Sequence, residues 1–285
     1  MEGKERDTLF RKLFKYEWTA MMRSLFPVYG AVLAVTVLNA LMFHVIVPEA
    51  GRAELLDSPF LELIPWFTGA LYAAVLAALG VMTVLPVIQR FYKGLLKEEG
   101  YLMFTLPVES WKIVLAKALA AVLMIHISLA VGFFSIGILA GELTFLKAVP
   151  GFLAECFKLI GAGFKEDAGM TVHVILFFLE GLLAMIAAWF ATVYHFYLAM
   201  ALGQLAGNHR VAFSVLAYVG ISSVFSIIMT ALLQTYPLWE PVLERMDMTA
   251  AIHVTGCAFL LWQVFQILTE ALGTEYLLKH HLNLE

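Results

Sequence analysis

Residues 63–89 read LIPWFTGALYAAVLAALGVMTVLPVIQ, and this run of 27 residues holds no charged side chain. A helix rises about 1.5 Å per residue, so about 20 apolar residues suffice to cross the hydrocarbon core of a bilayer. Unpaired backbone groups are not tolerated in that core, and a helix pairs all of its own. The stretch therefore predicts a membrane-spanning helix.

Five further apolar runs follow the same rule. Four are uncharged and 25, 24, 29 and 22 residues long, and the fifth, residues 168–209, carries Glu180 as its single charge. This longest run could form one long helix or two short ones; one helix is favoured, because no proline or turn cluster divides it. The predicted spans are approximately 25–47, 63–89, 118–141, 172–203, 211–235 and 250–269.

Composition agrees with an all-α, polytopic integral membrane protein. The chain is 62% hydrophobic and 14% charged, whereas a soluble domain is about half apolar and about a quarter charged. The apolar runs continue without a polar half that could fold in water, so residues 25–285 are interpreted as one six-helix domain. The net charge of -4 offers no basic surface for nucleic acid.

Residues 1–24 form a separate segment in this interpretation. Apolar residues such as Leu9, Leu13 and Trp18 recur every three or four positions, with Arg11 and Lys15 between them. This pattern is typical of an amphipathic helix lying on the inner leaflet, with its basic side chains near anionic headgroups. The alternative is a cytoplasmic extension of the first span.

The distribution of basic residues predicts the orientation. Six spans place both termini, the segment 90–117 and the turn at Arg210 on one side of the membrane. That side holds 13 of the 18 Lys and Arg residues, and the other side holds 5. Cytoplasmic loops carry the excess of positive charge, so we expect a multi-pass protein of the cell membrane with both termini cytoplasmic.

The cytoplasmic segment between the second and third spans, RFYKGLLKEEGYLMFTLPVESWKIVLAK (residues 90–117), is richer in charge and aromatic rings than a connector requires. Gly100 and Pro107 divide it into two short helical pieces, and Glu109 or Ser110 could cap the helix that follows. An amphipathic connection without a partner is the alternative interpretation.

This segment resembles the permease subunits of type-2 ATP-binding-cassette (ABC) transporters, in particular the small six-span bacterial permeases. The residues that carry the resemblance are Phe91, Tyr92, Lys93, Glu98, Glu99, Gly100, Tyr101, Leu102, Thr105, Leu106, Pro107, Val108 and Lys117. The N-terminal Leu13, Phe14, Lys15, Glu17 and Trp18 and the C-terminal residues 282–285 also look familial. The pair Tyr101 and Leu102 departs from the threonine–leucine pair that often follows the glycine.

The resemblance implies a transport subunit, with export as the expected direction, whose segment from Phe91 to Pro107 couples it to a separate ATP-binding subunit. The chain holds no Walker A phosphate loop. ATP and magnesium are therefore expected on the partner, and this chain is expected to hold no cofactor and to have no enzymatic activity of its own. A second permease copy, or a related permease, would complete the pathway.

Polar residues within the spans are the other candidates for function. Glu180 and His173 lie seven residues apart on nearly one face of the fourth predicted span, and Ser222, Ser226 and Thr230 recur every four residues in the fifth. They could line a substrate path. Glu180 and His173 could instead lie at the outer interface, and the hydroxyls could join neighbouring helices.

Other functions have less support in the sequence. No metal-ligand spacing and no Ser-His-Asp or GxSxG pattern occurs, and Asp is absent from the predicted spans. A membrane adaptor or sensor that binds a cytosolic protein, or a membrane enzyme, remain alternatives to the permease. The sequence does not identify the substrate.

Overall fold

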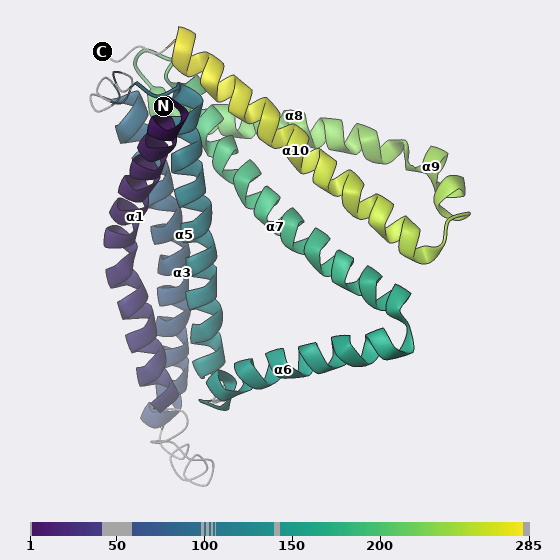
Figure 1. The fold of residues 1–285 in the computed structure, drawn as a ribbon. Coiled ribbons are helices and arrows are strands. Elements are labelled where there is room, and N and C mark those ends of the chain that lie inside the picture. Colours follow the sequence, from purple (N-terminus) through teal and green to yellow (C-terminus); the bar gives the residue numbers. More distant parts are fainter. Residues whose placement is uncertain are drawn as a thin grey trace. The chain divides into compact units, whose positions relative to one another are not determined.

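The computed structural model describes residues 2–41, 59–97, 100, 103, 105, 107–139 and 143–281, and within these ranges it contains helices and no strand (Figure 1). The helices are α1 (Glu2–Leu41), α3 (Pro59–Leu96), α5 (Ser110–Leu139), α6 (Leu143–Glu166), α7 (Ala168–Gly203), α8 (Arg210–Gln234), α9 (Tyr236–Leu243) and α10 (Met248–His280).

Six of these helices are long and apolar enough to cross a membrane. They cover Thr8–Leu41, Trp66–Leu96, Ser110–Leu139, Ala168–Gly203, Arg210–Gln234 and Met248–His280. Large apolar side chains on them are exposed, among them Phe26 (70%), Phe178 (73%) and Leu261 (70%). Such surface is costly in water and suits lipid. The prediction of an all-α chain with six apolar helices of spanning length is confirmed.

The helices are longer than the predicted spans. The run with Glu180 forms one continuous helix, α7, as predicted. Helix α10 continues to His280, so Glu270, which the sequence places at the end of a span, lies in the middle of a helix. Residues 42–47 and 140–141 of the predicted spans lie outside the described residues.

The separate N-terminal helix predicted for residues 1–24 is not confirmed. Helix α1 runs without a break from Glu2 to Leu41 and contains Pro27. The amphipathic residues are its first turns, because no glycine or turn signal separates them from the apolar run that follows.

Two helices were not expected from the sequence. Helix α6 has 24 residues and lies in the connection between the third and fourth spans, where Phe157 and Phe164 are exposed. Helix α9 has 8 residues and carries a proline in its first turn, where the missing N–H has no intrahelical partner to lose.

The chain divides into two compact units. The first comprises Met1–Glu17, Val87–Val122 and Glu166–Glu285, and the second comprises Trp18–Pro86 and Leu123–Lys165. The division falls inside α1, α3 and α5, so each of these helices contributes to both units.

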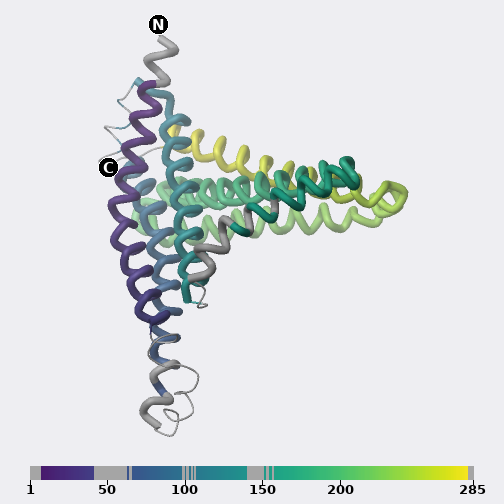
Figure 2. Tube along the Cα trace, turned by 60° about the horizontal axis from the view of Figure 1, so that its bottom comes forward, coloured from purple at the N-terminus to yellow at the C-terminus, as the bar shows by residue number. Residues whose placement is uncertain are grey.

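In the second unit, two serines of α5 join α1 and α3, which run beside it in both views (Figures 1 and 2). Ser128 bonds Tyr29 and Thr83, each at 2.8 Å. Ser135, two turns later, bonds Thr36 and Tyr72, each at 2.7 Å. Hydroxyls of this kind hold helices together within a bilayer, because an unpaired polar group in hydrocarbon is costly.

In the first unit, α7 packs against both α10 and α8. The chain turns closely between α7 and α8: a Cβ placed on Gly203 would lie 2.7 Å from the backbone oxygen of Arg210 and against the Ser214 hydroxyl. A backbone oxygen cannot move aside as a flexible side chain can, so this turn requires glycine.

We expect Gly203→Ala to destabilise the protein by about 1–3 kcal/mol, the usual cost of overpacking. Thermal unfolding of the purified protein measures the effect. Gly207→Ala is the matched control, because nothing lies within 4 Å of a Cβ there. Equal melting temperatures for the two variants would contradict the close approach.

Candidate functional site

The predicted coupling residues follow the end of α3. Phe91, Tyr92 and Lys93 lie in its last turns. The Gly100 N–H donates to the Lys97 carbonyl at 2.7 Å, and Pro107 lies in a bend before α5. The remaining predicted members lie outside the described residues; these are Glu98, Glu99, Tyr101, Leu102 and Leu106.

Both ends of this segment are tied to one buried carboxylate. Lys117 Nζ donates to Glu17 Oε1 at 2.6 Å, and Arg90 Nε donates to Glu17 Oε2 at 2.9 Å. The side chains of Glu17 and Lys117 are 2% and 1% exposed, whereas that of Arg90 is 25% exposed. We call these three residues the Glu17 cluster. Glu17 and Lys117 belong to the resemblance described above, but sequence reasoning did not pair them and missed Arg90.

The surroundings leave little freedom to the Glu17 cluster. Lys117 Nζ also donates to the Arg90 carbonyl at 3.3 Å, and a Cβ on Gly94 would lie 2.8 Å from Nζ. The Arg90 guanidinium lies over the Tyr16 ring, 5.1 Å from its centroid. Helix α1, the end of α3 and the start of α5 are therefore held at a single point.

Next to Arg90, Phe91 connects α3 to α7. Its ring stacks on that of Tyr197, with centroids 4.0 Å apart and planes inclined by 13°, and neither side chain is exposed. Tyr194 meets Tyr197 edge-on at 6.0 Å. A displacement of the end of α3 would thus be transmitted to α7 through fully packed rings.

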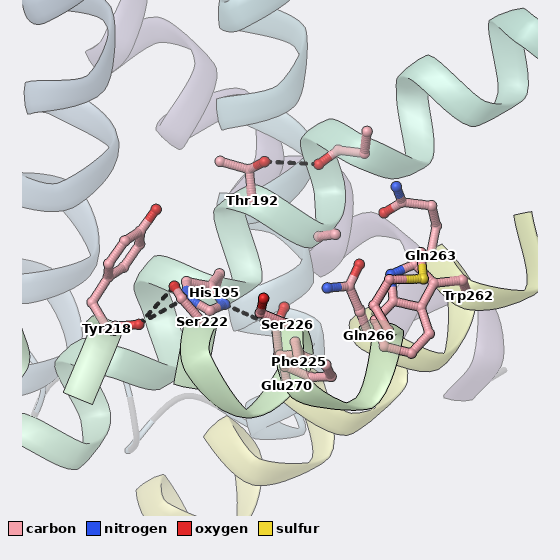
Figure 3. A pocket seen from close by; sticks show the side chains of 13 residues that line it. Thr192, His195, Tyr218, Ser222, Phe225, Ser226, Trp262, Gln263, Gln266 and Glu270 are labelled. Atoms are coloured by element: carbon pink, nitrogen blue, oxygen red, sulfur yellow. Dashed lines mark hydrogen bonds and ion pairs between the residues drawn. The ribbon is translucent and has the colours of Figure 1, made fainter. Parts of the chain in front are cut away.

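A cavity of about 390 Å³ lies among α7, α8 and α10 (Figure 3). Its lining includes Thr192 and His195 from α7, Ser222, Phe225 and Ser226 from α8, and Trp262, Gln263, Gln266 and Glu270 from α10. Of the predicted path residues, Ser222 and Ser226 line this cavity. Thr230 does not; its hydroxyl donates to the Ser226 carbonyl on its own helix.

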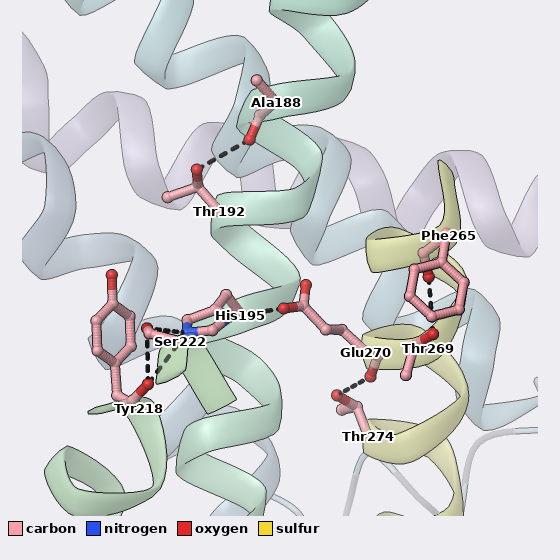
Figure 4. Close-up of polar contacts among 9 residues, drawn as sticks. All are labelled: Ala188, Thr192, His195, Tyr218, Ser222, Phe265, Thr269, Glu270 and Thr274. Carbon is pink, nitrogen blue, oxygen red and sulfur yellow. Dashed lines mark hydrogen bonds and ion pairs between the residues drawn. The ribbon is translucent and has the colours of Figure 1, made fainter. Parts of the chain in front are cut away.

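His195 is bonded at both ring nitrogens (Figure 4). Nδ1 lies 2.6 Å from Glu270 Oε1, and Nε2 lies 2.9 Å from Ser222 Oγ and 3.3 Å from the Tyr218 carbonyl oxygen. A carbonyl only accepts, so the contact with Tyr218 is a hydrogen bond in the state in which Nε2 carries a hydrogen. The proton between Nδ1 and Glu270 is then shared by the pair, which is neutral as a whole whichever partner holds it.

Sequence reasoning missed the pair of His195 and Glu270. The two residues are 75 positions apart, and the sequence pattern makes Glu270 the charge that ends the last predicted span. Two features point to a buried site here. One is a histidine in the middle of an apolar run, and the other is a carboxylate followed by more helix-forming sequence.

The order Ser222–His195–Glu270 has the connectivity of a catalytic triad, and its hydrogen-bond direction depends on which ring nitrogen of His195 carries a hydrogen. A nucleophilic serine must give its proton to the histidine. The Ser222 hydroxyl donates to the Tyr218 carbonyl at 2.8 Å, one turn earlier on α8. This carbonyl competes with His195 for the serine proton.

Glu180 and His173 belong to a second cluster, in which His253 of α10 lies between them. Glu180 Oε1 is 2.6 Å from His253 Nδ1, and His253 Nε2 is 3.0 Å from His173 Nδ1. The Phe177 ring stacks on His253 at 4.2 Å. Glu180 also lines a separate cavity of about 780 Å³ among α7, α9 and α10. The structure thus places Ser222 and Ser226 at one cavity and Glu180 and His173 in another cluster, with Thr230 in neither.

No group of three metal-ligating side chains occurs among the described residues. Comparison of the chain with protein-family models, with curated proteins and with solved structures found no match.

Because the side chains of Glu180 and His253 are 23% and 19% exposed, we expect Glu180→Gln to be tolerated. Glutamine keeps an acceptor for His253, and partly exposed ion pairs contribute about 0–1 kcal/mol. The melting temperature of the purified protein should stay near that of the unmodified protein. If the chain is a permease, as the resemblance implies, turnover should also be retained. Complete loss of turnover at normal protein level would contradict this expectation.

Proposed function

We propose that this chain is the membrane-spanning permease subunit of an ABC transporter, an exporter that moves an unidentified substrate with ATP hydrolysed by a separate subunit. The observation that carries the proposal is the segment from Arg90 to Lys117. It holds the residues that resemble the coupling element of small type-2 permeases, and the Glu17 cluster ties both of its ends. A simple connector does not need two cationic anchors on one buried carboxylate.

The contacts in the first unit supply a route for coupling. The Glu17 cluster moves together with the end of α3 and the start of α5. Phe91 moves with α3, and its stacked ring displaces Tyr197 and so moves α7. His195 lies two residues before Tyr197 on the same helix and lines the cavity. Rigid helices carry such motions between sites in many transporters and switches. ATP binding outside the membrane would in this way reshape a cavity inside it.

In this proposal the termini and the coupling segment face the cytoplasm of a cell membrane, in accordance with the excess of basic residues on that side. The partners are an ATP-binding subunit, which holds ATP and magnesium, and a second copy of this chain or a related permease.

The double variant Glu99→Ala/Tyr101→Ala tests the coupling assignment. Both positions lie between α3 and α5, outside the helices of spanning length, so membrane expression should be normal. We expect either weaker co-purification of the ATPase, by about tenfold or more because central contacts carry most binding energy, or ATP hydrolysis that continues without transport.

The partner is identified by its Walker A sequence and by photolabelling with an azido-ATP. Glu244→Ala, in the connection before α10, is the matched control and should behave like the unmodified protein. A double variant that binds the ATPase and transports at the unmodified rate would refute the coupling assignment. An associated ATPase that never drives transport would favour an adaptor.

A further inference from the structure

The chemistry of the cavity among α7, α8 and α10 indicates what it binds. Glu270 is the one carboxylate among the described lining residues, and that lining contains no Lys or Arg. The second carboxylate oxygen of Glu270, Oε2, has no hydrogen-bond partner among the described side chains and backbone. Negative charge can therefore develop in this cavity without a fixed cation to balance it.

Aromatic and amide groups complete the lining. The rings of Phe225 and Trp262 meet edge-on at 5.9 Å, and Gln263, Gln266 and Ser226 add neutral polar atoms (Figure 3). Tryptophan and phenylalanine faces attract alkylammonium groups, and the attraction grows when water is excluded. Pockets of roughly 300–1,000 Å³ hold small organic molecules, which includes this cavity.

The hydrogen bonds around His195 allow two protonation states. In the first state, Nε2–H points to Ser222 and Tyr218, and a second proton lies between His195 Nδ1 and Glu270. If the Nε2 proton leaves, the proton between the partners remains as Nδ1–H donated to Glu270, and Nε2 becomes an acceptor. The Ser222 hydroxyl then needs only to turn from the Tyr218 carbonyl, 2.8 Å away, to Nε2, 2.9 Å away.

The two states differ by one unit of charge. The pair is neutral before the Nε2 proton leaves and carries one negative charge afterwards. The Glu270 side chain is fully buried, so this charge is shielded from water. An isolated charge there is costly in the low dielectric of a membrane protein. A cation in the cavity offsets that cost, because Coulomb attraction is strong where water is absent.

We propose that this cavity is a binding site for a small organic cation of the alkylammonium class, which binds in exchange for one of the two protons held by the pair of His195 and Glu270. The cation lies against Trp262 and Phe225, and the released proton passes to bulk solvent. The titratable group that faces the pair from α8 is Tyr218, whose ring meets His195 edge-on at 4.5 Å. The inference goes beyond the permease assignment, since binding does not require the ATPase.

The test uses the purified full chain in nanodiscs, with choline as the probe and 3,3-dimethyl-1-butanol as its uncharged isostere. Titration calorimetry in buffers of different ionisation enthalpy should show saturable choline binding with release of about one proton per cation, as linkage requires. The isostere should bind roughly tenfold more weakly or not at all, a difference of about 1.4 kcal/mol.

Glu270→Gln keeps the size of the side chain and should weaken choline binding by about tenfold or more and abolish proton release. Glu180→Gln is the matched control on the same helix pair, because its carboxylate pairs with His253 in the other cluster; it should bind like the unmodified protein. If Glu270→Gln is not monodisperse, Trp262→Leu tests the site with the charged pair intact and should weaken binding by roughly threefold or more.

Three results would overturn the inference: no saturable choline binding by the unmodified protein, equal affinity for the uncharged isostere, or unchanged binding by folded Glu270→Gln and Trp262→Leu variants. Choline binding without proton release would overturn the exchange. None of these results bears on whether the chain associates with an ATPase, so they are distinguishable from a failure of the permease proposal.

Discussion

Replacing Glu17 by leucine should destabilise the protein by about 3–5 kcal/mol, because the change removes one partner of a buried ion pair and leaves the charge of Lys117 buried. The Lys117 side chain is 1% exposed, and the Arg90 carbonyl is a poor substitute for a carboxylate at 3.3 Å. We expect the melting temperature of the purified protein to fall by on the order of 10 °C, measured by fluorescence-detected size exclusion after heating.

A second substitution distinguishes the loss of charge balance from the loss of packing. Glu17→Leu/Lys117→Met removes both buried charges and leaves Arg90, which is 25% exposed and can reach water or a headgroup. Replacing a buried pair by apolar side chains is often neutral, so most of the lost stability should return. A double variant as unstable as the single one would show that the cost is steric.

The ion pair of Lys279 with Glu275 provides the matched control for burial. Its N–O distance of 2.6 Å equals that of Lys117 with Glu17, but the two side chains are 52% and 22% exposed. Lys279→Met should therefore cost less than about 1 kcal/mol. Similar losses for Glu17→Leu and Lys279→Met would mean that burial does not determine the strength of the Glu17 cluster.

Phe91→Ala should have the second large effect, a loss of about 3–5 kcal/mol from the cavity left beside Tyr197. Both rings are fully buried and stacked at 4.0 Å. If the chain is the permease proposed above and Phe91 transmits motion to α7, a complex of the variant with the ATPase should hydrolyse ATP without transport, even at temperatures where the variant remains folded. Thermal unfolding and the ratio of transport to ATP hydrolysis measure the two effects.

The controls for Phe91 separate size from position. Phe91→Leu keeps most of the volume and should cost less than about 1.5 kcal/mol. Phe178→Ala removes a ring that is 73% exposed on α7 and should change neither stability nor coupling. Full coupling in a folded Phe91→Ala variant would exclude this ring from the route between α3 and α7.

The helical architecture could be predicted from the sequence because it follows from local physics. Hydrogen bonds within one segment satisfy its backbone, so run length and the absence of charge are enough to predict a spanning helix. The same reasoning failed for α6, whose 24 residues include charged side chains at Lys147, Glu155, Lys158 and Lys165. It also failed to distinguish a separate interfacial helix from the first turns of α1, because an amphipathic pattern specifies a face and not where a helix ends.

The sites could be predicted only in part. Ser222 and Ser226 were identified from their spacing, and both line the cavity. Glu180 and His173 were identified from the cost of polar groups in an apolar run, but their partner His253 was not, since it lies on another helix. A periodic pattern indicates which residues share a face of one helix and does not indicate what packs against that face.

The six long apolar helices and the all-α class follow from the order of residues alone, since both depend on contacts between residues a turn apart. The pairing of charges does not: Glu17 meets Lys117, 100 residues away, and His195 meets Glu270, 75 residues away, only through the packing of helices. Two side chains on different helices form an ion pair only if each helix is rotated about its axis so that the two face each other. That rotation is set by the packing of whole faces, which no local pattern contains.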